Sequence, residues 1–373
     1  MSQPTLPDLA GTDVVTLTQA VCDIASVSGS EAALADAVEA ALRHHPHLRV
    51  MRDGDAVVAR TDQGRADRVV VAGHLDTVPI RHNLPTRRRT GADGAEELWG
   101  RGTVDMKGGV AVALHLAARL TEPGKDVTWV FYDNEEVDGD RNGLGRVARH
   151  HPDWLEADFA VLGEPSNGNI EGGCNGTLRA EVRLVGRTAH SARAWMGHNA
   201  IHDAADVLAR LAAYRPAEIE VEGLVYREGL NAVGISGGVA GNMIPPEATV
   251  TLNYRFAPDK TPEQAFAHVL QVLPGYDVVL TDAAPAARPG LDHPVAQDFV
   301  AAVSAVTGGA PRPKYGWTDV ARFSALGIPA VNFGPGDPNL AHADDERVPT
   351  AQIETAATAL GAWLSGHPKE TPR

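Results

Sequence analysis

Cysteine is nearly missing from this chain. Among 373 residues only Cys22 and Cys174 occur, without the CxxC spacing of a thiolate metal site. Two cysteines cannot form a disulfide scaffold, so we expect a protein of a reducing compartment, the cytoplasm. Neither cysteine has an obvious His–Asp context, which argues against a cysteine nucleophile.

Basic residues and long apolar runs are also scarce. The chain has 33 Lys and Arg against 48 Asp and Glu, a formal net charge of −15. This balance argues against a general affinity for nucleic acid or anionic membranes, so an anionic substrate would have to be met by specific arginines. No apolar run approaches the roughly 18 residues of a membrane helix, and the N-terminus lacks the regions of a signal peptide. We therefore expect neither a nucleic-acid nor a membrane partner.

Helix-like and strand-like segments alternate in the first part of the chain. Short continuous apolar runs predict strands buried on both faces, and apolar residues at helical spacing predict helices between them. The expected strands are 68–73, 127–132 and 158–162. The expected helices are 107–120 and a pair within 13–43 that is broken at Ser28 and Gly29, with Ser30 as an N-cap. This order predicts βαβ units and a mostly parallel sheet flanked by helices, the α/β class.

The middle of the chain has a different pattern. Residues alternate between apolar and polar at 178–184 and 248–256, as in antiparallel strands with one solvated face. Helices are expected at 199–214 and 261–273, and a Pro- and Ala-rich return linker at 283–289. The α/β pattern then resumes with a helix at 294–306 and a strand at 329–333. The simplest architecture is a domain of residues 1–177 plus 290–373, with a two-layer α+β domain inserted at 178–289.

Carboxylates and histidines follow the predicted parallel strands. In open α/β sheets, ligands bind beyond the carboxyl ends of the strands, so these side chains are expected at one sheet edge. They come from five separate segments: His74 and Asp76, Asp105, Glu135 and Glu136, Glu164, and His342. Each motif alone has an ordinary structural interpretation, such as a turn or a solvated loop. Their shared placement favours a functional site.

The charge of this group indicates a metal centre. Five converging carboxylates without cations would repel one another and take up protons. Carboxylates with imidazoles and no thiolate suit Zn²⁺, Co²⁺ or Mn²⁺ better than Ca²⁺. If two divalent ions are held by three carboxylates and two neutral imidazoles, three negative charges face four positive ones, and a bound hydroxide restores neutrality. Such a set would be Asp105, Glu136, Glu164, His74 and His342.

Two local spacings suggest a division of roles. Residues two apart in an extended segment point to the same side, so Asp76 can hydrogen-bond the second nitrogen of His74. Of the neighbours Glu135 and Glu136, one can bind metal while the other takes a proton from water, and the spacing leaves open which does which. Asp133 is expected to be a solvent-facing turn residue.

At this point the motifs resemble a known family. GHLDTVP, GRGTVDMKGG, DNEE, GEPS and AHADDE, in this order over nearly the whole chain, resemble the M20 family of dinuclear zinc amidohydrolases and exopeptidases. Segments 171–179, 189–202 and 315–336 resemble its actinobacterial branch, which releases succinate from N-succinyl-LL-2,6-diaminopimelate. The resemblance implies a small-molecule N-acyl diamino acid as the substrate.

The resemblance also implies specific metal roles. Two Zn²⁺ ions per subunit are expected, with Co²⁺ as a candidate substitute. Asp105 would bridge the two ions, His74 and Glu164 would complete one site, and Glu136 and His342 the other.

Further roles follow from the same resemblance. Glu135 would be the general base, and Asp76 would belong to the catalytic group beside it. The inserted domain would act as a lid and would form a homodimer, in which His190 of one subunit stabilises the oxyanion in the other; His198 is a second candidate. The substrate would be contacted by Arg179, Asn242, Arg255 and Thr318. The family often has proline where Ala194 stands, and a GGTSD-like run near Thr318, and both departures bear on substrate identity.

Two other functions are compatible with these motifs. Another member of the family, such as an acetylornithine deacetylase, an acyl-amino-acid hydrolase or a carboxypeptidase-like enzyme, would use the same metal ligands. A non-catalytic metal-binding or scaffold protein would be expected to have lost Glu135 or a ligand, and none is lost.

Overall fold

The computed structural model describes residues 4–366, which form two compact units. The first unit contains the described residues up to Gly172, Gly290–Arg312 and those from Arg322 onward, and the second contains Gly173–Pro289 and Pro313–Ala321. Residues 173–177 and 313–321 therefore group with the second unit, whereas the sequence placed them in the domain of the first. The domain limits at 177 and 290 stay a prediction.

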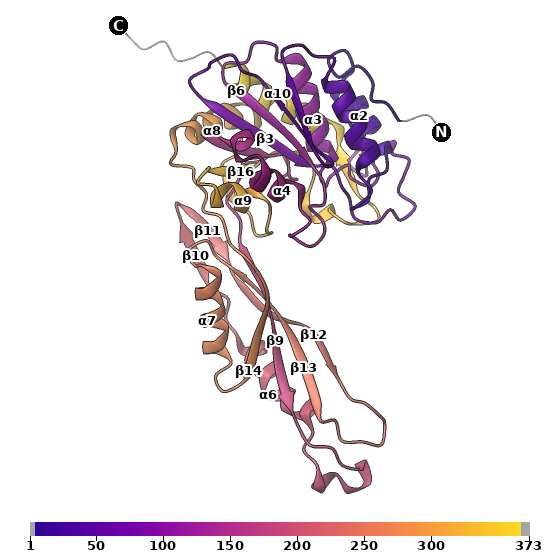
Figure 1. The fold of residues 1–373 in the computed structure, drawn as a ribbon, viewed down its shortest axis with the longest axis vertical. Coiled ribbons are helices and arrows are strands. Elements are labelled where there is room, and N and C mark those ends of the chain that lie inside the picture. The colour runs from indigo at the N-terminus through magenta and orange to yellow at the C-terminus, as the bar shows by residue number, and fades with distance from the viewer. Residues whose placement is uncertain (1–3, 367–373) are drawn as a thin grey trace. The chain divides into compact units, whose positions relative to one another are not determined.

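The first unit is built on an eight-stranded sheet with the order β1-β2-β6-β3-β7-β16-β8-β15 (Figure 1). The run β6-β3-β7-β16 is parallel, and β2 and β8 flank it in antiparallel pairing. This arrangement confirms the predicted α/β class with a mostly parallel sheet. The strands are β1 (Arg49–Asp53), β2 (Ala56–Arg60), β3 (Arg68–His74), β6 (Asp126–Tyr132), β7 (Phe159–Leu162), β8 (Glu171–Gly172), β15 (Arg312–Pro313) and β16 (Ala330–Asn332).

Helices cover both faces of this sheet. Val69 and Val71 of β3 belong to a core cluster with residues of α1, α2, α3, α8 and α10, whereas Val70 and Ala72, on the opposite face, are buried outside that cluster. Helix α4 contacts β2 and β6. The helical segments are α1 (Val14–Asp23), α2 (Ala32–Leu42), α3 (Lys107–Arg119), α4 (Gly143–His150), α5 (Pro152–Leu155), α8 (Pro294–Thr307), α9 (Val320–Ala325), η2 (Pro338–Leu340) and α10 (Thr350–Ser365).

A three-stranded antiparallel sheet joins distant parts of the first unit. It has the order β17-β5-β4, with β4 (Arg87–Thr90), β5 (Glu96–Trp99) and β17 (Arg347–Pro349). The guanidiniums of Arg87 and Arg89 lie over the Trp99 ring, at 5.5 and 5.9 Å from its centroid. Strand β17 follows the His342 segment, so this sheet anchors that segment to the rest of the unit.

The second unit is a four-stranded antiparallel sheet, β12-β13-β9-β14, with helices on one face. Alternate residues of β9 and β13 pack against α6 and α7, as their alternating sequence predicted. Thr261 caps α7 through a capping box with Gln264. The elements are β9 (Gly176–Val185), η1 (Ser191–Met196), α6 (Ala200–Ala213), the pair β10 (Glu218–Val221) and β11 (Leu224–Arg227), β12 (Gly229–Gly237), β13 (Glu247–Phe256), α7 (Pro262–Val272) and β14 (Asp277–Ala284).

Two local predictions are wrong. Glu31 stands at the N-cap of α2 instead of Ser30, and its carboxylate accepts hydrogen bonds from the backbone N–H groups of Gly29 and Asn134. The expected linker at 283–289 begins later, because β14 continues to Ala284.

Within residues 4–366, no helix is both long enough and apolar enough to span a membrane.

Candidate metal centre and active site

The first component of the site is the end of β3. His74, the last residue of that strand, is 1% exposed, and its Nδ1 lies 3.0 Å from the backbone oxygen of Asp76. A carbonyl can only accept, so Nδ1 carries the proton and Nε2 is the nitrogen available to a metal ion. The Asp76 carboxylate also lies 3.4 Å from Nδ1, close to the nitrogen that the sequence predicted it would contact. Asp76 therefore orients His74 through both its main chain and its carboxylate.

The Asp76 carboxylate also holds the loop after β6. Its Oδ1 and Oδ2 accept hydrogen bonds from the backbone N–H groups of Glu135 and Glu136, both at 3.0 Å, and Oδ2 also accepts from the Ser28 hydroxyl at 2.8 Å. Burial alone would raise the pKa of Asp76, but these hydrogen bonds and the neighbouring His74 lower it to about 2. Asp76 thus stays ionised and fixes the backbone of the glutamate pair.

Asp105 lies between two histidines. It ends the loop before α3, and its Oδ1 is 3.1 Å from Nε2 of His74 while its Oδ2 is 3.3 Å from Nε2 of His342. Burial would raise the pKa of Asp105, but the hydrogen bonds from His342 and His74 outweigh it and lower the pKa. A carboxylate whose two oxygens face different imidazoles has the geometry of a bridging ligand.

His342 is the most exposed member of the group. Its side chain is 53% exposed, against 9% for Glu136, whose Oε1 lies 2.8 Å from Nε2 of His342. Hydrogen bonds to Asp105 and Glu136 raise the pKa of His342 to about 10. The imidazole of His74 is also raised in pKa, because its hydrogen bonds to Asp105 and Asp76 outweigh the opposing effect of burial.

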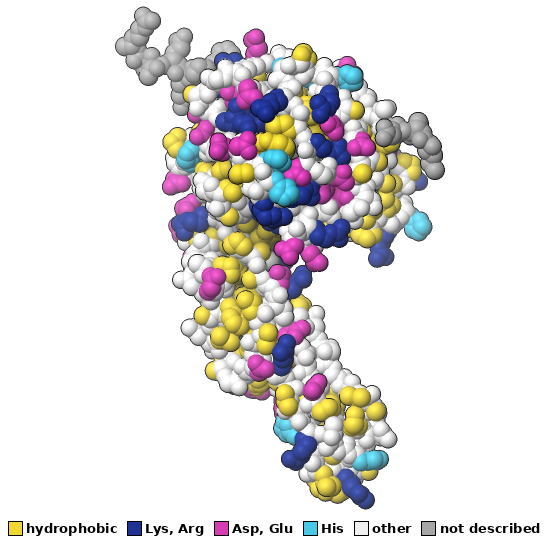
Figure 2. Space-filling model, in the orientation of Figure 1, with side chains coloured by type: hydrophobic (Ala, Val, Ile, Leu, Met, Phe, Trp, Pro, Cys, Tyr) yellow, Lys and Arg dark blue, Asp and Glu magenta, His cyan; other side chains and the backbone are white. Residues whose placement is uncertain are grey.

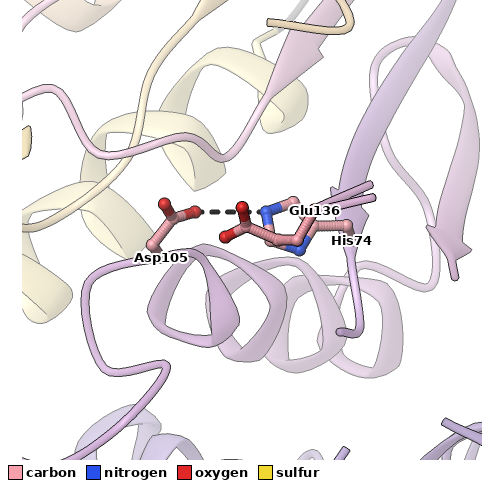
Figure 3. Close-up of side chains that lie close together, drawn as sticks. All are labelled: His74, Asp105 and Glu136. Carbon is pink, nitrogen blue, oxygen red and sulfur yellow. Dashed lines mark hydrogen bonds and ion pairs between the residues drawn. The ribbon is translucent and has the colours of Figure 1, made fainter. Parts of the chain in front are cut away.

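The donor set fits a divalent metal ion. In the described part of the chain, one group of at least three His, Cys, Asp or Glu residues has its ligand atoms within 4.8 Å of one another. It consists of His74, Asp105 and Glu136 (Figure 3). Imidazole nitrogen and carboxylate oxygen, without thiolate, suit Zn²⁺, Co²⁺ or Mn²⁺. Glu164, the remaining predicted ligand, follows β7 and is buried, at 5% exposure, but does not belong to this group.

The loop that carries Glu135 is anchored by residues far away in the sequence. Asp133 is buried and accepts hydrogen bonds from Nη1 and Nη2 of Arg146, at 3.1 and 2.6 Å, so its predicted role as a solvent-facing turn residue is wrong. Asn134 adopts a left-handed φ of 59°, and its backbone N–H donates to Glu31 at 3.1 Å. Glu135 follows these two anchored residues and is half-buried.

The remaining predicted residues belong to the second unit. Arg179 and Arg255 lie on neighbouring strands, β9 and β13, on the sheet face opposite α6 and α7. Burial, together with the charge of Arg179, lowers the pKa of Arg255. No ion pair joins either guanidinium to an acidic residue within the described structure.

The other four are placed as follows. His190 is exposed and its Nδ1 accepts a hydrogen bond from the backbone N–H of Ala192 at 3.1 Å, whereas His198 pairs with Asp203 at 2.6 Å. The backbone oxygen of Asn242 accepts from Ser191 at 2.9 Å. Thr318 is buried, and its backbone oxygen faces the Cys174 thiol at 3.7 Å.

Comparison with known proteins gives a consistent picture. The model of the peptidase family M20/M25/M40 matches residues 70–365. The chain is 55% identical to a putative succinyl-diaminopimelate desuccinylase, DapE, of Mycobacterium tuberculosis, over 96% of this chain and 99% of that protein. It is 47% identical to the succinyl-diaminopimelate desuccinylase of Corynebacterium glutamicum, over 96% of this chain and 97% of that protein. Among solved structures, it is similar in fold to aminopeptidase PepT of Bacillus cereus, with a TM-score of 0.74 at 18% identity over 94% of this chain and 97% of that one.

Proposed function

The chain belongs to the peptidase family M20/M25/M40, and we propose that it acts as a succinyl-diaminopimelate desuccinylase. The reaction is the hydrolysis of N-succinyl-LL-2,6-diaminopimelate to succinate and LL-2,6-diaminopimelate, a step of diaminopimelate and lysine biosynthesis. The observation that carries this proposal is the near-full-length similarity to two proteins of that name. The placement of Asp105 between His74 and His342 supplies a site for metal-dependent amide hydrolysis.

We assign the ligands of two Zn²⁺ ions to this site. His74 and Glu164 would hold one ion, Glu136 and His342 the other, and Asp105 both. Co²⁺, which accepts the same donors, is a candidate substitute. When bound, such ions polarise the substrate carbonyl and lower the pKa of water.

Glu135 is the proposed general base. Its carboxylate would take a proton from the attacking water, whose oxygen bonds to the amide carbon, and would give that proton to the departing nitrogen as the C–N bond breaks. The Asp76 carboxylate accepts hydrogen bonds from the backbone N–H groups of Glu135 and Glu136, which fixes the main chain from which both side chains extend. Glu136 can then face the metal ligands while Glu135 serves the proton transfer.

The substrate's negative charges need cations, and Arg179 and Arg255 are the proposed ones. Two adjacent guanidiniums repel each other, and a bound carboxylate would relieve that repulsion. Asn242 and Thr318 are proposed as further substrate contacts in the same unit, and His190 as the donor to the oxyanion, with His198 as the alternative.

A homodimer through the second unit completes the proposal. Strand β12 is an edge strand of its sheet, and Val233 and Ile235 on it are 61% and 55% exposed. Figure 2 shows hydrophobic side chains at the surface of this unit. A long apolar edge strand offers unpaired N–H and C=O groups to another strand, and a second copy of the same edge would cover them.

The test is a comparison of kcat/KM for N-succinyl-LL-2,6-diaminopimelate and N-acetylornithine on the zinc-loaded protein. We expect the succinylated substrate to be preferred by on the order of 10² or more. A preference for acetylornithine or for a dipeptide would assign the chain to another activity of the family. Less than one metal equivalent with no hydrolysis after zinc addition would instead indicate a non-catalytic protein.

A further inference from the structure

A fully buried ion pair lies directly behind the metal-ligand group. Nη1 of Arg101 is 2.7 Å from Oε2 of Glu346, and the two side chains are 2% and 0% exposed. Arg101 belongs to the loop before α3, and Glu346 to the segment before β17. Neither residue belongs to the proposed ligands.

Glu346 holds the main chain at Asp105. Its Oε1 accepts hydrogen bonds from the backbone N–H groups of Val104 and Asp105, at 2.9 and 3.1 Å. Its own backbone oxygen accepts from the N–H of Gly100 at 2.9 Å. The loop that presents the bridging carboxylate is therefore tied at both ends to one glutamate.

Arg101 holds the main chain at His342. Its guanidinium donates to the backbone oxygens of Ala343 at 3.2 Å and His342 at 3.4 Å. The imidazole of His342 is 53% exposed, so packing contributes little to its position. His342 also has a left-handed φ of 65°, a conformation that its surroundings must maintain.

Stability alone is a weak reason for such a pair. Burying two charges has a large desolvation cost, and well-packed apolar residues of similar volume are often as stabilising. The hydrogen bonds of this pair, however, converge on the two loops that present Asp105 and His342. Outer-shell contacts of this kind orient the residues that bind a metal.

We propose that Arg101 and Glu346 are positioning residues, which hold Asp105 and His342 at the spacing required to share one metal ion. This inference rests on the proposed function, since it assumes a metal ion between these two side chains. Loss of the ion pair should weaken binding of the ion assigned to Glu136 and His342 more than binding of the ion assigned to His74 and Glu164. The reason is that Arg101 contacts the His342 segment directly.

The test uses Glu346→Gln and Arg101→Lys in the full chain. Glutamine keeps an acceptor for the two N–H groups but removes the charge, and lysine keeps the charge but loses the forked donor. Zinc affinity is measured by competition with a chromophoric chelator, and the Co²⁺-loaded proteins are compared by visible absorption. We expect each variant to bind one of the two metal equivalents about 10–100-fold more weakly and to show an altered Co²⁺ spectrum.

The matched control is Arg68→Met. Arg68 lies at the opposite end of β3 from His74 and pairs with the buried Asp126 at 3.7 Å. We expect this variant to lower the thermal midpoint while both zinc affinities and the Co²⁺ spectrum stay at wild-type values.

The outcomes separate the two proposals. Unchanged affinities and spectra in both variants would overturn the positioning role and leave the proposed function intact. Failure of the wild-type protein to bind metal would overturn both. If Glu346→Gln does not fold, Arg101→Lys alone decides, because wild-type metal binding in that variant would contradict the proposal.

Discussion

The carboxylate of Asp76 accepts a hydrogen bond of 3.0 Å from the backbone N–H of Glu135. Through this contact the segment that presents His74 also holds the loop that carries the proposed base. A second N–H, that of Glu136, binds the other oxygen of the same carboxylate at 3.0 Å. One buried side chain thus connects the proposed metal ligand His74 with the loop of the proposed base Glu135.

Asp76→Asn tests this alignment. An asparagine presents only one oxygen, so one of the two glutamate N–H groups would face an NH₂ group and lose its acceptor. We expect kcat to fall about 10–100-fold while zinc content stays near that of the wild type. Steady-state kinetics and metal analysis of the same preparation measure both quantities.

Ser28→Ala is the control for that variant. It removes the hydroxyl that donates to Oδ2 of Asp76 at 2.8 Å but leaves both glutamate contacts in place. Its effect on kcat is expected to be less than about tenfold. An equal loss of kcat in Asp76→Asn and Ser28→Ala would mean that the hydrogen bonds to the N–H groups of Glu135 and Glu136 do not determine the rate.

Asp105→Asn should weaken the binding of both metal ions. The substitution removes the charge of the residue whose oxygens face His74 and His342 at 3.1 and 3.3 Å. After dialysis against a chelator and reloading, we expect well under two equivalents of zinc by elemental analysis. Asp138→Asn, at an exposed loop position, is the matched control and should retain both equivalents. Full zinc binding by Asp105→Asn would remove Asp105 as the bridging ligand.

Arg179→Met should act on substrate binding. Loss of a charged hydrogen bond to a substrate carboxylate is expected to lower kcat/KM for the succinylated substrate by about 10–100-fold. Arg183→Met on the same strand is the control, since Arg183 lies 3.8 Å from a carboxylate of its own, that of Glu181. If Arg183→Met reduces kcat/KM as much as Arg179→Met, Arg179 has no specific role.

Asp126 gives a pH-dependent contribution to stability. Burial would raise its pKa, but hydrogen bonds from the backbone of Gln63 and Arg65 and from the Thr61 hydroxyl lower it below its ordinary value of 3.8. A lowered carboxyl pKa stabilises the fold above pH 3.8, and this stabilisation is lost as the pH falls through the folded-state pKa. Asp126→Asn is therefore expected to be less stable than the wild type by about 1–3 kcal/mol at pH 7.

Urea unfolding of both proteins at pH 7 and near pH 3 measures this difference. The difference in the free energy of unfolding between wild type and Asp126→Asn should become smaller at the lower pH. A gap that stays constant or widens on acidification would contradict the assignment.

Much of the first unit could be predicted because its sequence patterns are local. Continuous apolar runs marked β3 and β6, and the polar residues after them marked the sheet edge where His74, Asp105 and Glu136 gather. Strand β12 carries no such pattern, because most of it is exposed on both faces, and it was missed.

The supporting contacts of the site could not be read from spacing. Arg101 and Glu346 are 245 positions apart, and Glu31 lies 103 positions before Asn134. An isolated acidic residue in a loop looks solvated until its partner is known. The same reason explains why Asp133 was interpreted as a turn residue although it pairs with Arg146.

Glu135→Gln tests the central claim most directly. Glutamine has nearly the same shape but cannot take a proton from water, and general-base catalysis contributes about 10²–10⁴-fold. We expect the variant to retain two zinc equivalents and to lose kcat by at least that factor when succinate release is measured. Near-normal turnover by a fully zinc-loaded Glu135→Gln variant would contradict it.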